Sequence, residues 1–263
     1  MRIFLLVICI IGSAWCCAQE QLILQSSNLP GNDTVWVFKP DNYSGAQKYP
    51  AIYLLHGKTG KYSSFSDLIN LQDFANKYQF IIICPDGFYD AYYLNSPLIK
   101  NSQFESFFTN ELYPYILKNF AVDSTKIVIT GISMGGAGAM YLFVKYPYLF
   151  LSAGSISGVF NLNYTPSRYN CLSRLLGEYD SNKKVFDDYS VVNLVVNIRH
   201  LNKKILFDCG TEDPFYKSNV EFKEKCDKLG IDAEFDSRPG SHNIKYWEVS
   251  IVKHFDFFSS VIK

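Results

Sequence analysis

Short apolar segments alternate with amphipathic segments along most of this chain, and this alternation restricts the fold more than any other feature. The runs Pro50–Leu55, Phe80–Cys84 and Lys126–Thr130 are largely apolar, as is typical of strands buried on both faces of a sheet. Apolar residues recur at helical spacing over Ser64–Tyr78 and Gln103–Asn119. Helical connections between buried strands are typical of a parallel sheet. We therefore predict an α/β fold with a mostly parallel central sheet and helices on both faces.

The rest of the chain continues this order of strands and helices. Strands are predicted over Val35–Lys39, Ala153–Ser157, Lys204–Asp208 and Ala233–Ser237, and helices over Ala137–Lys145 and Tyr246–Phe258. The stretch Asn161–Asn202 is polar and has no clear period, so we predict an irregular insertion above the sheet, after the strand Ala153–Ser157. No repeat or linker divides the chain beyond residue 18, which predicts one domain over residues 19–263.

The first 18 residues differ from the rest and have the pattern of a signal peptide. A positive charge at the start precedes the apolar run Ile3–Gly12, and small residues follow up to Ala18. The run is too short to span a bilayer comfortably, so we expect no stable membrane anchor. Lipidation of Cys16 is disfavoured because the bulky Trp15 precedes it. We predict a signal peptide over residues 1–18 and a secreted or periplasmic protein.

Charge and cysteine content narrow the set of partners and cofactors. Lys and Arg together number 25, as do Asp and Glu, so the chain offers no basic surface for nucleic acid. The cysteines beyond the signal peptide are Cys84, Cys171, Cys209 and Cys226. In an oxidising compartment they could form up to two disulfides, and free buried thiols fit the sequence equally well. No Cys/His group has the spacing of zinc ligands, so we expect no metal and no other cofactor.

The pentapeptide Gly131-Ile132-Ser133-Met134-Gly135 is the strongest catalytic signal in the chain. Its G-x-S-x-G pattern stands between a predicted strand and a predicted helix, which is the context of a nucleophile elbow. Glycines permit the tight turn that lifts the Ser133 hydroxyl above the sheet edge. The N-terminus of the following helix favours negative charge on a reacting carbonyl oxygen. We predict that Ser133 is a catalytic nucleophile; the alternative is a glycine-rich turn without a catalytic role.

A serine nucleophile needs a base and an acid, and in hydrolases with this elbow the acid and then a histidine follow it. His242 lies in the turn after the last predicted strand, and Asp213 follows the strand Lys204–Asp208. We predict that His242 is the base. Asp213 is the predicted acid, with Asp208 and Glu212 as alternatives. Packing or solvated roles are expected for the other histidines: His56, His200 and His254.

Two backbone N–H donors are needed to bind an oxyanion. Met134, which follows the nucleophile, is expected to supply one of them. Lys58 is expected to supply the other from the loop after the strand Pro50–Leu55. The neighbouring Gly57 is the alternative donor and is expected to contact the substrate. A buried His56 imidazole that braces this turn is compatible with that role.

Tyrosines follow the turn Pro85-Asp86-Gly87 at the end of another predicted strand. Tyr89, Tyr92 and Tyr93 could therefore line a pocket and stack on a sugar or an aromatic acyl group. We predict Tyr92 and Tyr93 as substrate-binding residues. Packing beneath the insertion is the alternative for their rings.

Several of these segments together resemble the esterase family of α/β-hydrolases, which groups feruloyl and acetyl-xylan esterases, tributyrin esterases, mycolyltransferases and S-formylglutathione hydrolases. The matching segments are YLLHGKTG (53–60), SFFTNELYPYI (106–116), ITGISMGGAGAMYL (129–142), DCGTEDPF (208–215) and RPGSHN (238–243). The resemblance implies the α/β-hydrolase fold and a catalytic triad of Ser133, Asp213 and His242. It also implies that Lys58 and Met134 are the oxyanion donors.

The function implied by this resemblance is that of a secreted serine carboxylesterase that forms an acyl-enzyme intermediate. The expected substrate is a short-chain or carbohydrate-linked acyl ester, either a small molecule or part of a polysaccharide. The alternatives are a non-catalytic carbohydrate-binding module with the hydrolase fold, or an acyltransferase or peptidase with the same triad. Ala137 and Ile244 depart from the family, in which His and Trp are common at these positions, and imply a different acyl pocket.

Overall fold

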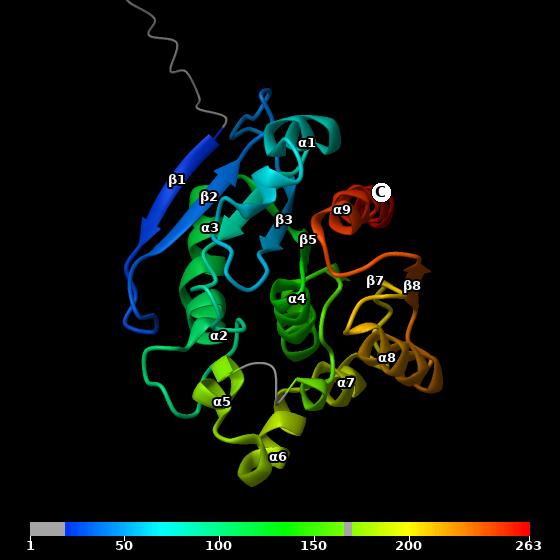
Figure 1. Cartoon of the computed structure of the whole chain (residues 1–263). Coiled ribbons are helices and arrows are strands. Elements are labelled where there is room, and N and C mark those ends of the chain that lie inside the picture. Colours follow the sequence, from blue (N-terminus) through cyan, green and yellow to red (C-terminus); the bar gives the residue numbers. More distant parts are fainter. Residues whose placement is uncertain (1–18, 166–169) are drawn as a thin grey trace, which may run out of the picture.

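The computed structural model describes residues 19–165 and 170–263, so the predicted signal peptide over residues 1–18 lies outside the described residues. Within them, eight strands form one sheet flanked by helices (Figure 1). The strands are β1 (Gln19–Leu24), β2 (Asp33–Phe38), β3 (Tyr49–Leu55), β4 (Ile81–Pro85), β5 (Val122–Gly131), β6 (Ser152–Ile156), β7 (Ile205–Gly210) and β8 (Ala233–Arg238). Their order is β1-β2-β4-β3-β5-β6-β7-β8. Strand β2 is antiparallel to both of its neighbours, β1 and β4, and the other neighbouring pairs are parallel. The predicted α/β fold with a mostly parallel sheet is confirmed.

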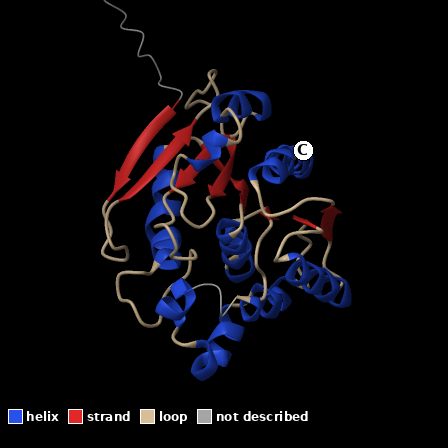
Figure 2. Ribbon diagram, in the orientation of Figure 1, coloured by secondary structure: helices blue, strands red, loops and turns tan. Residues whose placement is uncertain are grey.

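Two groups of helices cover the two faces of the sheet (Figure 2). The helices are α1 (Leu71–Tyr78), α2 (Phe104–Phe107), α3 (Tyr113–Asn119), α4 (Met134–Lys145), α5 (Asn170–Leu176), α6 (Tyr179–Tyr189), α7 (Val191–Leu194), α8 (Tyr216–Leu229) and α9 (Ile244–Ile262). Strand side chains alternate between the faces, so Ile52 and Leu54 pack with α1 and α9 on one side. Ala51 and Tyr53 pack on the other side with α2, α3, α4, α7 and α8. Because both faces are covered, β3 is apolar along its whole length.

Helix α4 begins at the serine turn and is buried along almost its whole length. Its C-terminal end is fixed by Glu105 of α2, which is itself buried. The hydroxyl groups of Tyr141 and Tyr146 and the ammonium group of Lys145 all donate hydrogen bonds to this carboxylate. Hydrogen bonds to an ionised acceptor are roughly twice as strong as neutral ones. The helix that follows Ser133 is therefore held firmly against α2.

Most predicted helices and strands are present, with boundaries shifted by a few residues. The predicted helix Ser64–Tyr78 is interrupted, because Ser64–Asp67 is a 3₁₀ turn and α1 follows it separately. The side chain of Asn70 caps α1 by accepting hydrogen bonds from N–H groups of its first turn. Helix α4 begins at Met134 rather than at Ala137, since glycines of low helix propensity obscure its first turn in the sequence.

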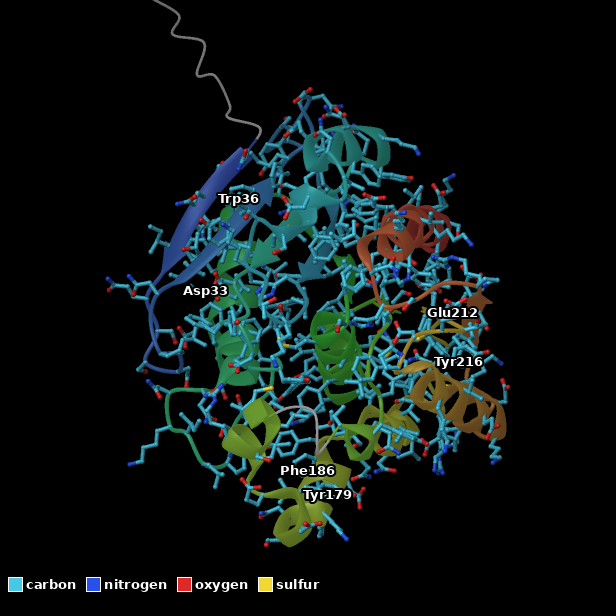
Figure 3. The ribbon with its side chains drawn as sticks, in the orientation of Figure 1. Asp33, Trp36, Tyr179, Phe186, Glu212 and Tyr216 are labelled. Carbon is cyan, nitrogen blue, oxygen red and sulfur yellow. The ribbon has the colours of Figure 1, made fainter. Side chains whose placement is uncertain are left out.

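The stretch Asn161–Asn202 is not irregular as predicted, because α5, α6 and α7 lie within it. Its apolar side chains are largely buried, and Phe186 of α6 meets Tyr179 edge to face at 5.1 Å between ring centroids (Figure 3). Polar residues between these side chains hid the helical period. Strand β1 and helix α8 are also absent from the predicted set. The side chains of β1 are exposed or half-buried, and α8 buries only a narrow stripe.

Candidate active site

Ser133 lies at a sharp turn between β5 and α4. Its backbone has φ 55° and ψ −114°, a conformation that a residue with a side chain rarely adopts. The turn is held in this shape because the Ser133 N–H donates to the carbonyl of Ile156 on β6 at 2.7 Å. A Cβ on Gly131 would lie 2.4 Å from the carbonyl oxygen of Gly135, so the tight approach requires glycine. The half-buried Ser133 side chain is thereby held at the carboxyl edge of the sheet.

The structure brings Ser133, His242 and Asp213 into one chain of hydrogen bonds. His242 Nε2 lies 2.9 Å from Ser133 Oγ, and His242 Nδ1 lies 2.7 Å from Asp213 Oδ2. Asp213 is 5% exposed, and its other carboxylate oxygen accepts the Phe215 N–H at 2.8 Å. With Nδ1–H donating to Asp213, the Nε2 lone pair faces the serine hydroxyl and can accept its proton.

Two aromatic rings fix the plane of the His242 imidazole. Phe215 meets it edge to face with centroids 5.2 Å apart, and Trp247 does the same at 5.1 Å. The Trp247 indole N–H in turn donates to Ser157 Oγ at 3.3 Å. The sequence predicts neither residue for the site. Aromatic residues are common both after an acid loop and in the first turns of a helix. The role of Phe215 and Trp247 in orienting His242 therefore becomes visible only from their contacts in the structure.

The alternative acids serve elsewhere. Asp208 is buried and accepts from Ser250 Oγ at 2.6 Å, and its other oxygen lies 2.8 Å from His254 Nε2. The second nitrogen of His254 pairs with Thr130 Oγ1 at 2.8 Å, so this histidine is fully engaged within the core. Glu212 is exposed near Tyr216 at the edge of the molecule (Figure 3).

The remaining histidines have structural positions. His56 is 1% exposed, and its Nε2 accepts the Gly87 N–H at 2.7 Å. Because an amide N–H can only donate, the proton of the neutral imidazole is on Nδ1, which lies 2.8 Å from the Gly57 carbonyl oxygen. His56 therefore braces the turn that leads from β3 into the predicted oxyanion loop. His200 is exposed at the surface.

The residues predicted to bind the oxyanion lie around Ser133. Met134 is the first residue of α4, and the first N–H groups of a helix have no acceptor within the helix. Gly57 and Lys58 line the same cavity as Ser133 and His242. This arrangement permits donors from α4 and from the loop after β3 to approach one carbonyl oxygen.

The cavity at Ser133 has a volume of about 400 Å³. Its apolar wall is formed by Phe65, Leu68, Ile132, Ile244 and Trp247. Ile244, one of the two departures from the family, is thus part of the wall. An opening of this size and polarity suits a small apolar group beside the reacting serine.

The prediction that Tyr93 binds substrate is wrong. Its side chain is fully buried, and its hydroxyl donates to the His56 carbonyl oxygen at 2.9 Å. The ring also packs edge to face on Phe104 and lies against Gly138 of α4. Tyr92 is 5% exposed and borders a small pocket shared with Tyr189 and Val191 of the insertion instead of the Ser133 cavity. The packing alternative therefore holds for both rings.

The cysteines are free and buried in the described part of the chain, with no disulfide between Cys84, Cys171, Cys209 and Cys226. Burial raises the pKa of the Cys226 thiol to about 12.

Among the described residues, no group of three His, Cys, Asp or Glu side chains is placed to hold a metal ion. No helix within residues 19–165 and 170–263 is long and apolar enough to cross a bilayer.

In an α/β-hydrolase the nucleophile, the acid and the histidine follow strands of a mostly parallel sheet, in that order along the chain. Here Ser133 follows β5, Asp213 follows β7 and His242 follows β8, so the fold and the site define an α/β-hydrolase. The chain matches the sequence model of the family described as "Putative esterase" over residues 26–258. It therefore belongs to this esterase family, and it is a serine hydrolase of carboxylic esters.

Individual relatives agree with this assignment. The chain is 25% identical over 251 residues to an S-formylglutathione hydrolase of Arabidopsis thaliana, covering 87% of each protein. It is also 25% identical over 264 residues to an acetyl esterase of Caldicellulosiruptor saccharolyticus, covering 92% of this chain and 98% of the relative. Among solved structures, a ferulic acid esterase has a TM-score of 0.79 at 23% identity, over 93% of this chain and 98% of that chain. At that identity the structural likeness shows the shared fold.

Proposed function

We propose that the protein is an exported serine carboxylesterase that cleaves short-chain or carbohydrate-linked acyl esters. The observation that carries this proposal is the hydrogen-bond chain from Ser133 through His242 to Asp213, with distances of 2.9 and 2.7 Å. A serine hydroxyl is a weak nucleophile unless an adjacent base removes its proton. A buried carboxylate behind the histidine supplies the orientation and the charge that this base needs.

The proposed reaction has two acyl-transfer steps. His242 Nε2 takes the proton of Ser133 Oγ as the oxygen attacks the ester carbonyl carbon. The N–H groups of Met134 and Lys58 stabilise the oxyanion that forms, and Asp213 stabilises the imidazolium. His242 then gives its proton to the leaving alcohol, which departs and leaves an acyl group on Ser133. Water, activated in the same way, releases the acid and restores the serine.

The size of the cavity and the relatives support a small acyl group. The cavity at Ser133 measures about 400 Å³ and has an apolar wall, which fits an acyl chain of a few carbons. One relative is named an acetyl esterase, and an acetyl group is of this size. Export is supported by the signal-like sequence of residues 1–18.

The substitution Ser133→Ala tests the nucleophile. Turnover of p-nitrophenyl acetate is expected to fall by a factor on the order of 10⁴ or more, because the acyl-enzyme can no longer form. Circular dichroism and the thermal midpoint should stay close to those of the unchanged protein. Turnover that persists in this variant would overturn the proposal. Acetylated xylan, methyl ferulate and tributyrin, assayed side by side, would rank the ester classes.

A further inference from the structure

A second cavity lies beside the catalytic one. It has a volume of about 660 Å³, and Thr59 and Gly60 line both cavities. The next residue, Lys61, lines the second cavity alone. The loop that carries the proposed oxyanion donor therefore runs from one cavity to the other. The other walls of the second cavity come mainly from the loop after β4 and from Arg174 of α5.

The lining of this second cavity combines one exposed aromatic ring with several short polar groups. Tyr89 is 59% exposed, so its ring is accessible to a ligand in this cavity. The cavity also presents carboxylates, an amide and a hydroxyl, from Asp86, Asp90, Asn101 and Ser102. A sugar ring is recognised by such a set, because its C–H face packs on an aromatic ring while its hydroxyl groups exchange hydrogen bonds.

The charges around the second cavity favour a neutral ligand. Its two basic side chains, Lys61 and Arg174, are balanced by Asp86 and Asp90. One basic group is already paired, because Arg174 Nη2 lies 2.6 Å from Asp90 Oδ1. An anionic ligand such as a glutathione thioester would meet two carboxylates here without a surplus of positive charge. A neutral polyhydroxyl ligand meets no such penalty.

The second cavity is also coupled to the oxyanion loop. The Thr59 N–H donates to the Tyr89 carbonyl oxygen at 2.8 Å, directly after Lys58. Phe88 and Tyr89 both have positive φ, at 50° and 56°, without being glycine. Backbone held in such a conformation is a feature of ligand clamps. The loop thus presents the Tyr89 ring outward and supports the neighbouring oxyanion loop at the same time.

We propose that the second cavity binds a neutral sugar unit from the alcohol part of the ester while Ser133 attacks the acyl carbon in the first cavity. This inference rests on the proposed esterase function, which it narrows to sugar esters. Tyr89 is then the residue that selects the alcohol part, and the Asp90–Arg174 pair holds one wall of its site.

The test compares two substrates that differ in their alcohol part. On this proposal, acetylated xylotriose occupies both cavities during the reaction, whereas p-nitrophenyl acetate occupies the catalytic one alone. The measured quantity is kcat/KM for acetylated xylotriose divided by kcat/KM for p-nitrophenyl acetate. We expect this ratio to fall roughly three- to tenfold in Tyr89→Ala, which is the loss of binding that one aromatic contact accounts for. Asp90→Asn should lower the same ratio. Tyr148→Ala is the matched control, because Tyr148 is also an exposed tyrosine, at 77%. The substrate ratio of this variant should stay unchanged.

An unchanged ratio in Tyr89→Ala would overturn the proposal, and so would selective loss of activity on S-formylglutathione. Calorimetric titration of the Ser133→Ala protein with unmodified xylotriose tests the cavity without catalysis. We expect binding that weakens roughly three- to tenfold when Tyr89→Ala is added. Absence of binding overturns the sugar site even if esterase activity is present. Binding without esterase activity would instead contradict the proposed function alone.

Discussion

A Cβ atom on Gly135 would lie 1.9 Å from the carbonyl oxygen of Leu55, the last residue of β3. Gly135 follows Ser133 by two positions, and the loop with Gly57 and Lys58 begins just after Leu55. The backbone of the nucleophile turn therefore packs directly on the strand that leads into the proposed oxyanion loop. This contact sets the position of the serine relative to its oxyanion donors, and no side chain intervenes.

Replacing Gly135 by alanine should prevent this contact. Alanine is the better helix former by about 1 kcal/mol, but the clash with backbone is expected to cost about 3 kcal/mol or more. Urea unfolding of Gly135→Ala should therefore show a lower midpoint together with low esterase activity. Gly45→Ala serves as the control, since a Cβ there meets nothing within 4 Å. Normal stability and activity of Gly135→Ala would contradict the described packing.

The Asp213→Asn substitution tests the orientation of the base. An Asn amide can donate to His242 Nδ1, which would place the imidazole proton on Nε2, facing Ser133. We expect kcat on p-nitrophenyl acetate to fall on the order of 10³- to 10⁴-fold with the fold retained. Glu212→Gln alters the neighbouring exposed carboxylate and should leave kcat unchanged. Equal effects of the two substitutions would argue against Asp213 as the acid.

Asp33 predicts a pH dependence of stability. Burial, more than any other cause, raises the pKa of this carboxyl group well above its usual range. The hydrogen bond from the Asp86 N–H lowers the pKa in part, and the negative charge of the Asp86 side chain raises it further. Asp33 Oδ1 accepts the Asp86 N–H at 3.2 Å, while Oδ2 has no hydrogen-bond partner among the described residues. The folded protein thus holds this proton more tightly than the unfolded chain, and stability is lost as the pH rises from about 4 through the folded pKa.

The Asp33→Asn variant should lack this loss, because the amide keeps the acceptor and carries no charge. Thermal unfolding should give a higher Tm for the variant at pH 8, with the difference shrinking as the pH approaches 4. A difference between the two proteins that grows on acidification would contradict the raised pKa of Asp33.

The buried thiols predict low reactivity. All four are free, and burial raises the pKa of Cys226 to about 12, so almost no thiolate forms at neutral pH. In the chain that begins at Gln19, Ellman's reagent should react with none of them under native conditions over several minutes. In guanidinium without reductant it should react with all four. A count of zero in guanidinium would show that they form disulfides instead.

The sequence predicts those parts of the site that depend on local order along the chain. Buried strands have largely apolar runs, and Ser133 and Asp213 each follow such a run, while His242 follows the last predicted strand, Ala233–Ser237. Their meeting at one sheet edge can therefore be expected. In the structure the side chains of these three residues meet and are joined by hydrogen bonds. Elements with one narrow buried stripe, such as α8, have no comparable signal.

Side-chain direction in loops could not be predicted. Tyr89 points to a cavity while Tyr93 is fully buried, although both follow the same turn. These directions depend on positive φ angles, which occur at Phe88, Tyr89, Tyr92 and Tyr93. None of these positions is a glycine or a proline, so the sequence does not predict the angles. Likewise, the rings of Phe215 and Trp247 meet His242 only in the folded chain, where the loops after β7 and β8 and the first turns of α9 lie together. Such contacts arise from tertiary structure alone.

The activation of Ser133 by His242 is the central claim, and covalent labelling tests it most directly. The protein would be treated with a fluorophosphonate, digested and examined by mass spectrometry, because only an activated serine reacts quickly with this reagent. We expect one phosphonyl adduct on the peptide that contains Ser133, and no adduct in His242→Ala. A protein that stays unlabelled, or one labelled at another serine with Ser133 unmodified, would contradict the account.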